Sequence, residues 1–139
     1  MEINWENKVN ADISKLDSLF IQLNQILKLD LEVLSVHLFD DEGLLEINRK
    51  FLDHDYYTDI ITFDLRDEFS NEAELFISTE RINDNAISNG LNPEEELFRI
   101  CIHSMLHLAG FNDKTESDIK TIRQKENEYL QLLFHVKHL

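Results

Sequence analysis

The segment from Ile102 to Asp113 constrains this chain more than any other, because it sets two histidines and an aspartate at the spacing of a metal site. On a helix, His103 and His107 lie one turn apart on the same face. Gly110 can take the left-handed conformation that ends a helix, and the chain can then bring Asp113 back towards the histidines. The pattern His-x3-His-x2-Gly-x2-Asp therefore predicts a helix, a tight turn and a metal site.

These three side chains are typical zinc ligands. Imidazole nitrogens and carboxylate oxygens both bind Zn²⁺, and three protein ligands leave one tetrahedral position open, as in catalytic sites. In a chain with six histidines, a pair four residues apart carries little weight alone, but the glycine and aspartate after it make coincidence much rarer. We expect one Zn²⁺, or a similar divalent ion, bound by His103, His107 and Asp113.

The residue after the first histidine argues against one class of zinc enzyme. Zinc peptidases with an HExxH helix use the glutamate at this position as general base. This chain has Ser104 there, and a hydroxyl cannot replace a carboxylate as proton acceptor. Ordinary peptidase chemistry is disfavoured, although a zinc hydrolase acting on another substrate such as a peptide stays open as an alternative.

Composition bounds the class of protein. A chain of 139 residues, 42% hydrophobic and 29% charged, is expected to form one globular domain over residues 1–139. Its first ten residues lack the regions of a signal peptide, and no apolar run has the length of a membrane span. The single cysteine, Cys101, suits a reducing compartment, and its helical position favours a buried residue over a ligand. We therefore expect a cytoplasmic protein with no membrane partner.

Hydrophobic periodicity divides the chain into alternating elements. Strands are expected at residues 3–5, 31–39, 60–63 and 74–78. Helices are expected at residues 12–29, 41–52, 79–88, from 93 through the histidine pair, and 115–134. These elements predict an α+β domain, with a small four-stranded mixed sheet, about five helices, and the metal-site helix packed across the sheet. His37 is expected to pack within its strand, and His135 and His138 to lie in a solvated tail.

Three segments together resemble one known family. Residues 103–113 are similar to the motif His-Gly-x-Leu-His-Leu-x-Gly-Tyr-Asp-His of the YbeY family of metal-dependent endoribonucleases. Residues 47–51 and 58–63 resemble its Leu-Asn-x-x-Tyr/Phe and Thr-Asp-Val-Leu-Ser-Phe segments, and residues 73–78 resemble its Gly-Asp-Ile-x-Ile-Ser strand. The motifs occur in the family's order, and the resemblance covers nearly the whole chain.

The resemblance implies a single-strand-specific, metal-dependent endoribonuclease that acts in rRNA processing and ribosome biogenesis. The implied partners are ribosomal RNA, chiefly the 3′ end of the 16S rRNA, and the small ribosomal subunit. The implied cofactor is Zn²⁺, which would activate a water and stabilise charge on the phosphodiester. The group that accepts the proton is left open by the sequence.

The chain departs from the family pattern at three positions. Asp113 stands where the family usually has a third histidine, Ser104 replaces a glycine, and Leu52 replaces an arginine thought to act on RNA. A carboxylate still binds zinc, so the metal site can survive. The loss of the arginine leaves a catalytically weakened, ribosome-associated factor as a further alternative.

Three more residues are candidate catalytic residues. Arg49 lies one helical turn before Leu52 and could present its guanidinium to the same place, while His54 and Asp59 belong to the loop before the third strand. Solvation, or capping of backbone groups, would also explain each of them. Because the formal net charge is −15, RNA binding requires a local group of cations or a partner that supplies the positive charge. Arg49 and Lys50 are the expected ones, and Arg99 is expected to pair with Glu95 or Glu96.

Overall fold

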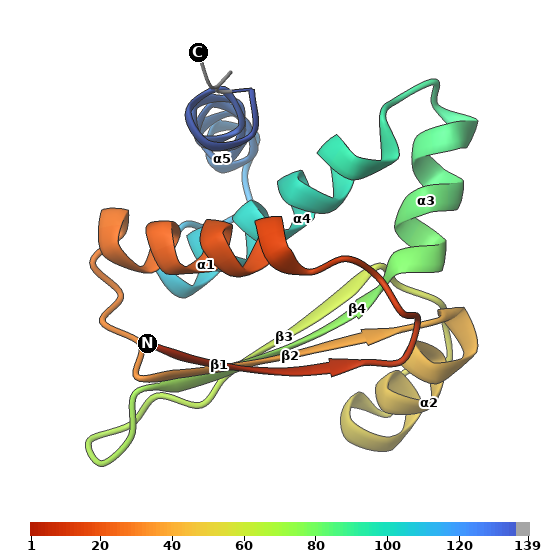
Figure 1. The fold of residues 1–139 in the computed structure, drawn as a ribbon, viewed down its shortest axis with the longest axis horizontal. Helices are drawn as coiled ribbons and strands as arrows, with labels where there is room; N and C mark the ends of the chain where they lie inside the picture. Colours follow the sequence, from red (N-terminus) through yellow and green to blue (C-terminus); the bar gives the residue numbers. More distant parts are fainter. Residues whose placement is uncertain (136–139) are drawn as a thin grey trace.

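A four-stranded mixed sheet forms the centre of the fold (Figure 1). The structure is a computed structural model that describes residues 1–135. The strands are β1 (Glu2–Asn7), β2 (Val33–Phe39), β3 (Ile60–Asp64) and β4 (Glu72–Ser78), in the spatial order β1-β2-β4-β3. The first, second and fourth strands are parallel, and β3 is an antiparallel edge strand beside β4. The predicted α+β fold with a small mixed sheet is confirmed.

Helices cover both faces of this sheet. Among the described residues these are α1 (Ser14–Ile26), α2 (Asp41–Leu52), α3 (Thr79–Ser88), α4 (Pro93–Leu108) and α5 (Glu116–Tyr129). Figure 1 shows α1 and α4 on one face and α2 on the other, with α5 beyond α4. The last helix was predicted to reach residue 134, but the α-helix ends at Tyr129 and continues as a π-helical turn, Leu130–Phe134.

Local capping chemistry explains where the helix around the histidine pair begins and where its neighbours start. The Asn92 side chain accepts the Glu95 N–H, and Pro93 occupies the first helical position. Ser78 and Thr115 cap α3 and α5 in the same way. The start of α1 differs: Asp12 accepts the Ser14 N–H, while Ile13 occupies the N-cap position and makes no side-chain hydrogen bond.

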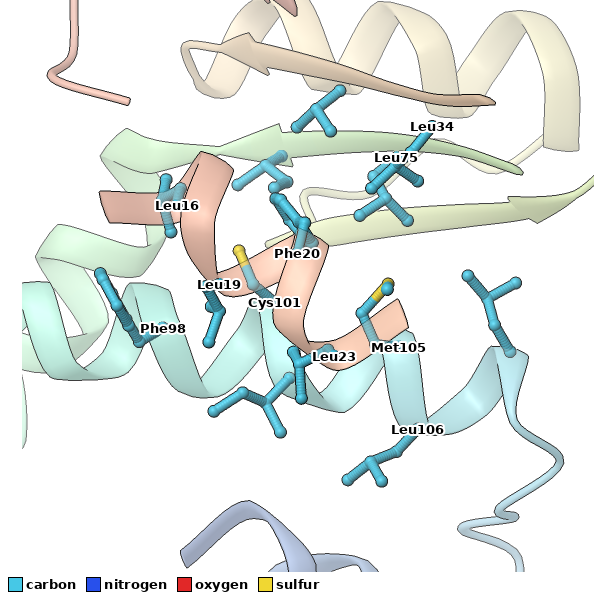
Figure 2. Close-up of a cluster of buried hydrophobic side chains, with 14 of the residues drawn as sticks. Leu16, Leu19, Phe20, Leu23, Leu34, Leu75, Phe98, Cys101, Met105 and Leu106 are labelled. Carbon is cyan, nitrogen blue, oxygen red and sulfur yellow. The ribbon is translucent and has the colours of Figure 1, made fainter. Parts of the chain in front are cut away.

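The main core lies between the sheet and the pair α1 and α4. Side chains from all three layers meet there, and Figure 2 shows them converging: Leu16, Leu19, Phe20, Leu23, Leu34, Leu75, Phe98, Cys101, Met105 and Leu106. Because side chains alternate along a strand, Leu75 and Ile77 enter this core while Phe76 points to the other face. There Phe76 packs with Leu44 of α2 and Ile61 of β3 in a smaller cluster.

The histidines outside the predicted metal site have local partners. The His37 ring stacks on Phe76 with centroids 4.2 Å apart, and its nitrogens lie 2.6 and 3.0 Å from carboxylate oxygens of Glu6 and Glu74. It is a packed strand histidine, as predicted. His135 follows the π-helical turn and contacts the Glu95 carboxylate at 2.8 Å. His138 lies outside the described residues.

Within residues 1–135, no helix has both the length and the apolar content needed to cross a bilayer. The one cysteine is fully buried in the core, on α4.

Burial raises the pKa of the Cys101 thiol to about 12, so almost no thiolate forms at neutral pH. We expect the native protein to resist a thiol-specific reagent such as DTNB at about pH 8, and to release one equivalent of product per chain after unfolding in guanidinium chloride. Fast stoichiometric reaction of the native protein would show that α4 is not packed as described.

Candidate metal centre

One strip of α4 stays partly exposed while the rest of the helix is buried. Of the residues from Phe98 to Leu108, those not buried are Arg99, Ile100, His103 and His107. Their spacing of three or four keeps them on one side of the helix. The other sides face α1 and the sheet, α3 and α5. Packing therefore directs both histidines to the same opening.

The end of α4 turns the chain back towards that opening. Gly110 has a φ of 97°, its N–H donates to the His107 carbonyl at 3.0 Å, and the Phe111 N–H donates to the Leu106 carbonyl at 3.1 Å. This is a Schellman motif, and its positive φ favours glycine. The predicted helix stop is confirmed, and it carries the chain to Asp113 three residues later.

The structure brings the three predicted ligands together. The two Nε2 atoms of His103 and His107 are 3.0 Å apart, and the Asp113 Oδ2 lies 3.4 Å from His107 Nε2 and 4.0 Å from His103 Nε2. Tetrahedral zinc with bonds of about 2.0–2.2 Å needs ligand atoms roughly 3.3–3.5 Å apart. The side chains are 27%, 33% and 51% exposed, so an ion can enter from solvent. The donor set and its spacing fit a divalent metal ion.

A buried carboxylate holds the first histidine in place. His103 donates its Nδ1–H to Glu126 Oε2 at 2.7 Å, which leaves Nε2 free to face the metal position. The Glu126 side chain, on α5, is only 6% exposed. Its second oxygen lies 3.3 Å from Arg99 Nη1, which compensates the buried charge. Arg99 also contacts Glu96 at 3.4 Å, so its predicted pairing with an α4 glutamate is confirmed.

Two hollows flank the ligands and share His103 and Ile60. The β3 hollow is lined by Ile60, Thr62, Asp64, His103, Ser104, His107 and Leu108. The α5 hollow is lined by Asp59, Ile60, Glu96, Arg99, Ile100, His103, Asp113, Ile119, Ile122, Arg123 and Glu126. The metal position therefore opens both along the edge strand and towards α5.

Ser104 has a structural role at the β3 hollow. It is fully buried, and its hydroxyl shares a 3.0 Å hydrogen bond with the Thr62 hydroxyl of β3. This contact fixes the histidine helix against the edge strand. The hydroxyl does not offer a carboxylate's basicity, in line with the sequence argument against ordinary peptidase chemistry.

Asp64, which lines the β3 hollow, forms an ion pair with Arg66. Arg66 donates from Nε and Nη2 to the two Asp64 oxygens at 2.8 Å each, and from Nη2 to the Leu108 carbonyl at 2.5 Å. These hydrogen bonds lower the pKa of the Asp64 carboxyl below its ordinary value, so this group is ionised at neutral pH. Arg66 thus satisfies a carbonyl at the end of α4.

The other predicted site residues are placed differently. Asp59 lines the α5 hollow with His103 and Asp113. His54 is exposed, stacks on Tyr56 with centroids 5.0 Å apart, and its Nδ1 lies 2.9 Å from the Tyr56 hydroxyl. Arg49 lies on α2, across the sheet from α4 (Figure 1), and contacts Asp55 at 2.5 Å. The structure brings Asp59 to the ligands but brings neither His54 nor Arg49 into the two hollows.

Two residues of the site were missed by sequence reasoning, namely Glu126 and Arg123. Glu126 follows Ile122 by four residues on the apolar face of the last helix, where a charged side chain requires a partner. That signal was available in the sequence. Arg123 had no comparable signal, because an exposed arginine on a helix is ordinary.

Comparison with known proteins now adds to this geometry. The family model described as Endoribonuclease YbeY matches residues 2–133. This chain belongs to the YbeY family. It is 47% identical to Endoribonuclease YbeY of Christiangramia forsetii, over 70% of this chain and 68% of that protein. It is 47% identical to the Cytophaga hutchinsonii protein of that name, over 66% and 65%. The matches thus span about two thirds of these relatives.

A solved structure supports the same fold. The solution structure of a protein from Thermotoga maritima superimposes with a TM-score of 0.71 and 26% sequence identity, covering 96% of this chain and 89% of that one. This chain therefore shares the fold of that protein over nearly its whole length.

Glu126→Gln should weaken metal binding by about 10- to 100-fold, because an amide orients and polarises the His103 ring less well than a carboxylate. A competition titration with a chromophoric chelator measures the change. Glu128→Gln is the matched control, since Glu128 lies on the same helix with its side chain 60% exposed. Equal affinities for the two variants would contradict a supporting role for Glu126.

Proposed function

We propose that this YbeY-family protein is a single-strand-specific, zinc-dependent endoribonuclease that matures the 3′ end of 16S rRNA in the cytoplasm. The observation that carries the proposal is the convergence of His103, His107 and Asp113 beside two open hollows. Family membership supports endoribonuclease activity. The RNA target and the small-subunit partner come from the family resemblance of the sequence.

The roles of the residues follow from their positions. A divalent ion bound by this donor set would activate water and offset negative charge on a phosphodiester. His103 and His107 present neutral nitrogens from a rigid helix, and Glu126 fixes the His103 ring by accepting its Nδ1–H. Asp59 lines the same hollow as His103 and Asp113, and we assign it as the acceptor of the proton from the attacking water.

The α5 hollow is acidic until a metal enters it. Four carboxylates and two arginines line it, so a divalent ion would bring its formal charge to neutrality. A polyanion is repelled by an uncompensated acidic surface. The metal is therefore required for RNA binding at this site as well as for the cleavage reaction.

Neither alternative reading is favoured over the nuclease. The HExxH peptidases carry their general base directly after the first histidine, and the residue at that position here, Ser104, has its hydroxyl buried in a contact with Thr62. The alternative of a catalytically weakened, ribosome-associated factor was suggested by Leu52. This residue lies at the end of α2, on the sheet face opposite α4 (Figure 1). His103, His107 and Asp113 come together without any contribution from Leu52.

Removal of the metal should abolish both RNA cleavage and most RNA binding. The purified protein is expected to hold about one equivalent of zinc, which is what one three-ligand site binds. A combined His103→Ala and His107→Ala variant should lose that metal and cleave no single-stranded RNA, as measured by elemental analysis and a gel assay. Metal content that survives both changes would overturn the ligand assignment.

Asp113→His should keep the metal. Imidazole replaces the carboxylate as a zinc ligand and restores the residue that the family motif usually carries. The measurement is metal content together with thermal stability, with Asn112→His as the neighbouring control. A folded Asp113→His protein without metal would show that the loop after Gly110 does not supply the third ligand.

A further inference from the structure

We propose that Arg123 is the phosphate-binding cation of this site, and that it holds the RNA backbone on the α5 side of the metal ligands. This inference rests on the proposed nuclease function and names the residue that binds its polyanionic substrate. It answers a difficulty raised by the net charge of −15: some local cation must receive the phosphates.

Position is the first reason. Arg123 lines the α5 hollow together with His103 and Asp113, so a strand that reaches the metal ligands through this hollow passes its guanidinium. The residue lies at the middle of α5, and α5 packs against α4. A rigid helix therefore carries the cation at the rim of the site.

Availability is the second reason. The Arg123 side chain is 61% exposed, and its Nη1 lies 3.8 Å from Glu126 Oε1, a long and weakly held ion pair. The other arginine of this hollow, Arg99, is 16% exposed and contacts Glu96, Glu126 and Asn127. Arg99 is occupied with the buried glutamate that supports His103, whereas the donors of Arg123 are open to a ligand from solvent.

The remaining candidate cations are less suited. Arg66, near the β3 hollow, places its donors on both Asp64 oxygens and on the Leu108 carbonyl. Arg49, on α2, contacts Asp55 in the loop that follows, and α2 packs on the opposite face of the sheet. Two exposed lysines, Lys114 and Lys120, accompany Arg123 in the sequence between the third ligand and the middle of α5. Neither lysine lines the α5 hollow, so Arg123 is its exposed cation, and α2 contributes none to it.

The guanidinium suits a phosphodiester chemically. Its planar donors can bind two phosphate oxygens at once, and such charge-assisted hydrogen bonds are strong for their size. Binding would be independent of the base, because phosphate contacts position a strand without reading its sequence. Arg123 would thus raise affinity for any single strand that enters the hollow, while the reaction itself stays with the metal ligands.

The test compares Arg123→Gln with wild type on a short single-stranded RNA, using metal-loaded proteins. We expect KM to rise about tenfold, the size of a lost charge-assisted hydrogen bond, with kcat changed far less. The slope of log affinity against log salt should fall by about 0.7, the value for one phosphate contact on a single strand. Metal content should equal that of wild type.

Two variants sharpen the comparison. Lys125→Gln removes one charge from the same helix at a side chain that pairs with Glu128 at 3.5 Å and does not line the α5 hollow, so its KM and salt slope should match wild type. Arg123→Lys keeps the charge and should recover part of the affinity.

The outcomes separate this inference from the proposed function. An active wild type with an unchanged KM and salt slope in Arg123→Gln would overturn the assignment of Arg123 and leave the nuclease proposal standing. Loss of metal in Arg123→Gln would also overturn it, because Arg123 would then act through Glu126. A metal-loaded wild type that neither binds nor cleaves RNA would overturn both proposals.

Discussion

The burial of α4 on all sides but one is the constraint on which the site depends. The helix packs against α1 and the sheet, α3 and α5, and its fully buried residues include Cys101, Ile102 and Met105. A helix packed in this way cannot rotate without moving apolar surface into water. The remaining strip then holds His103 and His107 at a fixed place beside the edge strand. Catalytic geometry in this protein is thus a consequence of core packing.

Contacts between elements refine that placement. The Ser104 hydroxyl joins α4 to β3, the Glu126 carboxylate joins it to α5, and Arg66 joins its last turn to the segment after β3. Glu126 and Arg99 form a buried charged pair that would be costly if either partner were lost. Each of these polar contacts lies directly beside a metal-site residue. These contacts therefore hold the helix that carries the ligands, whereas the buried Asn48 and Ser78 make their hydrogen bonds elsewhere, to Tyr56 and Asp41.

The charge distribution reconciles an acidic protein with an RNA substrate. Acidic side chains predominate over the chain and also line the α5 hollow, where Arg99 compensates part of their charge. A bound divalent ion would change the electrostatic character of this hollow more than any single side chain does. An acidic surface elsewhere would limit unspecific association with nucleic acid, since little counterion release is gained there. Recognition would then be restricted to the neighbourhood of the metal.

Local patterns in the chain were enough to predict the elements, the mixed sheet and the three candidate ligands that the structure brings together. The spacing of His103 and His107 and the turn at Gly110 act within one helix and its end, where backbone geometry alone decides which side chains meet. The surroundings of the site required the tertiary structure. Glu126 meets His103 across two helices, and the choice between Arg49 and Arg123 depends on which face of the sheet each helix covers. Such pairings are set by packing between distant segments, which spacing along the chain does not encode.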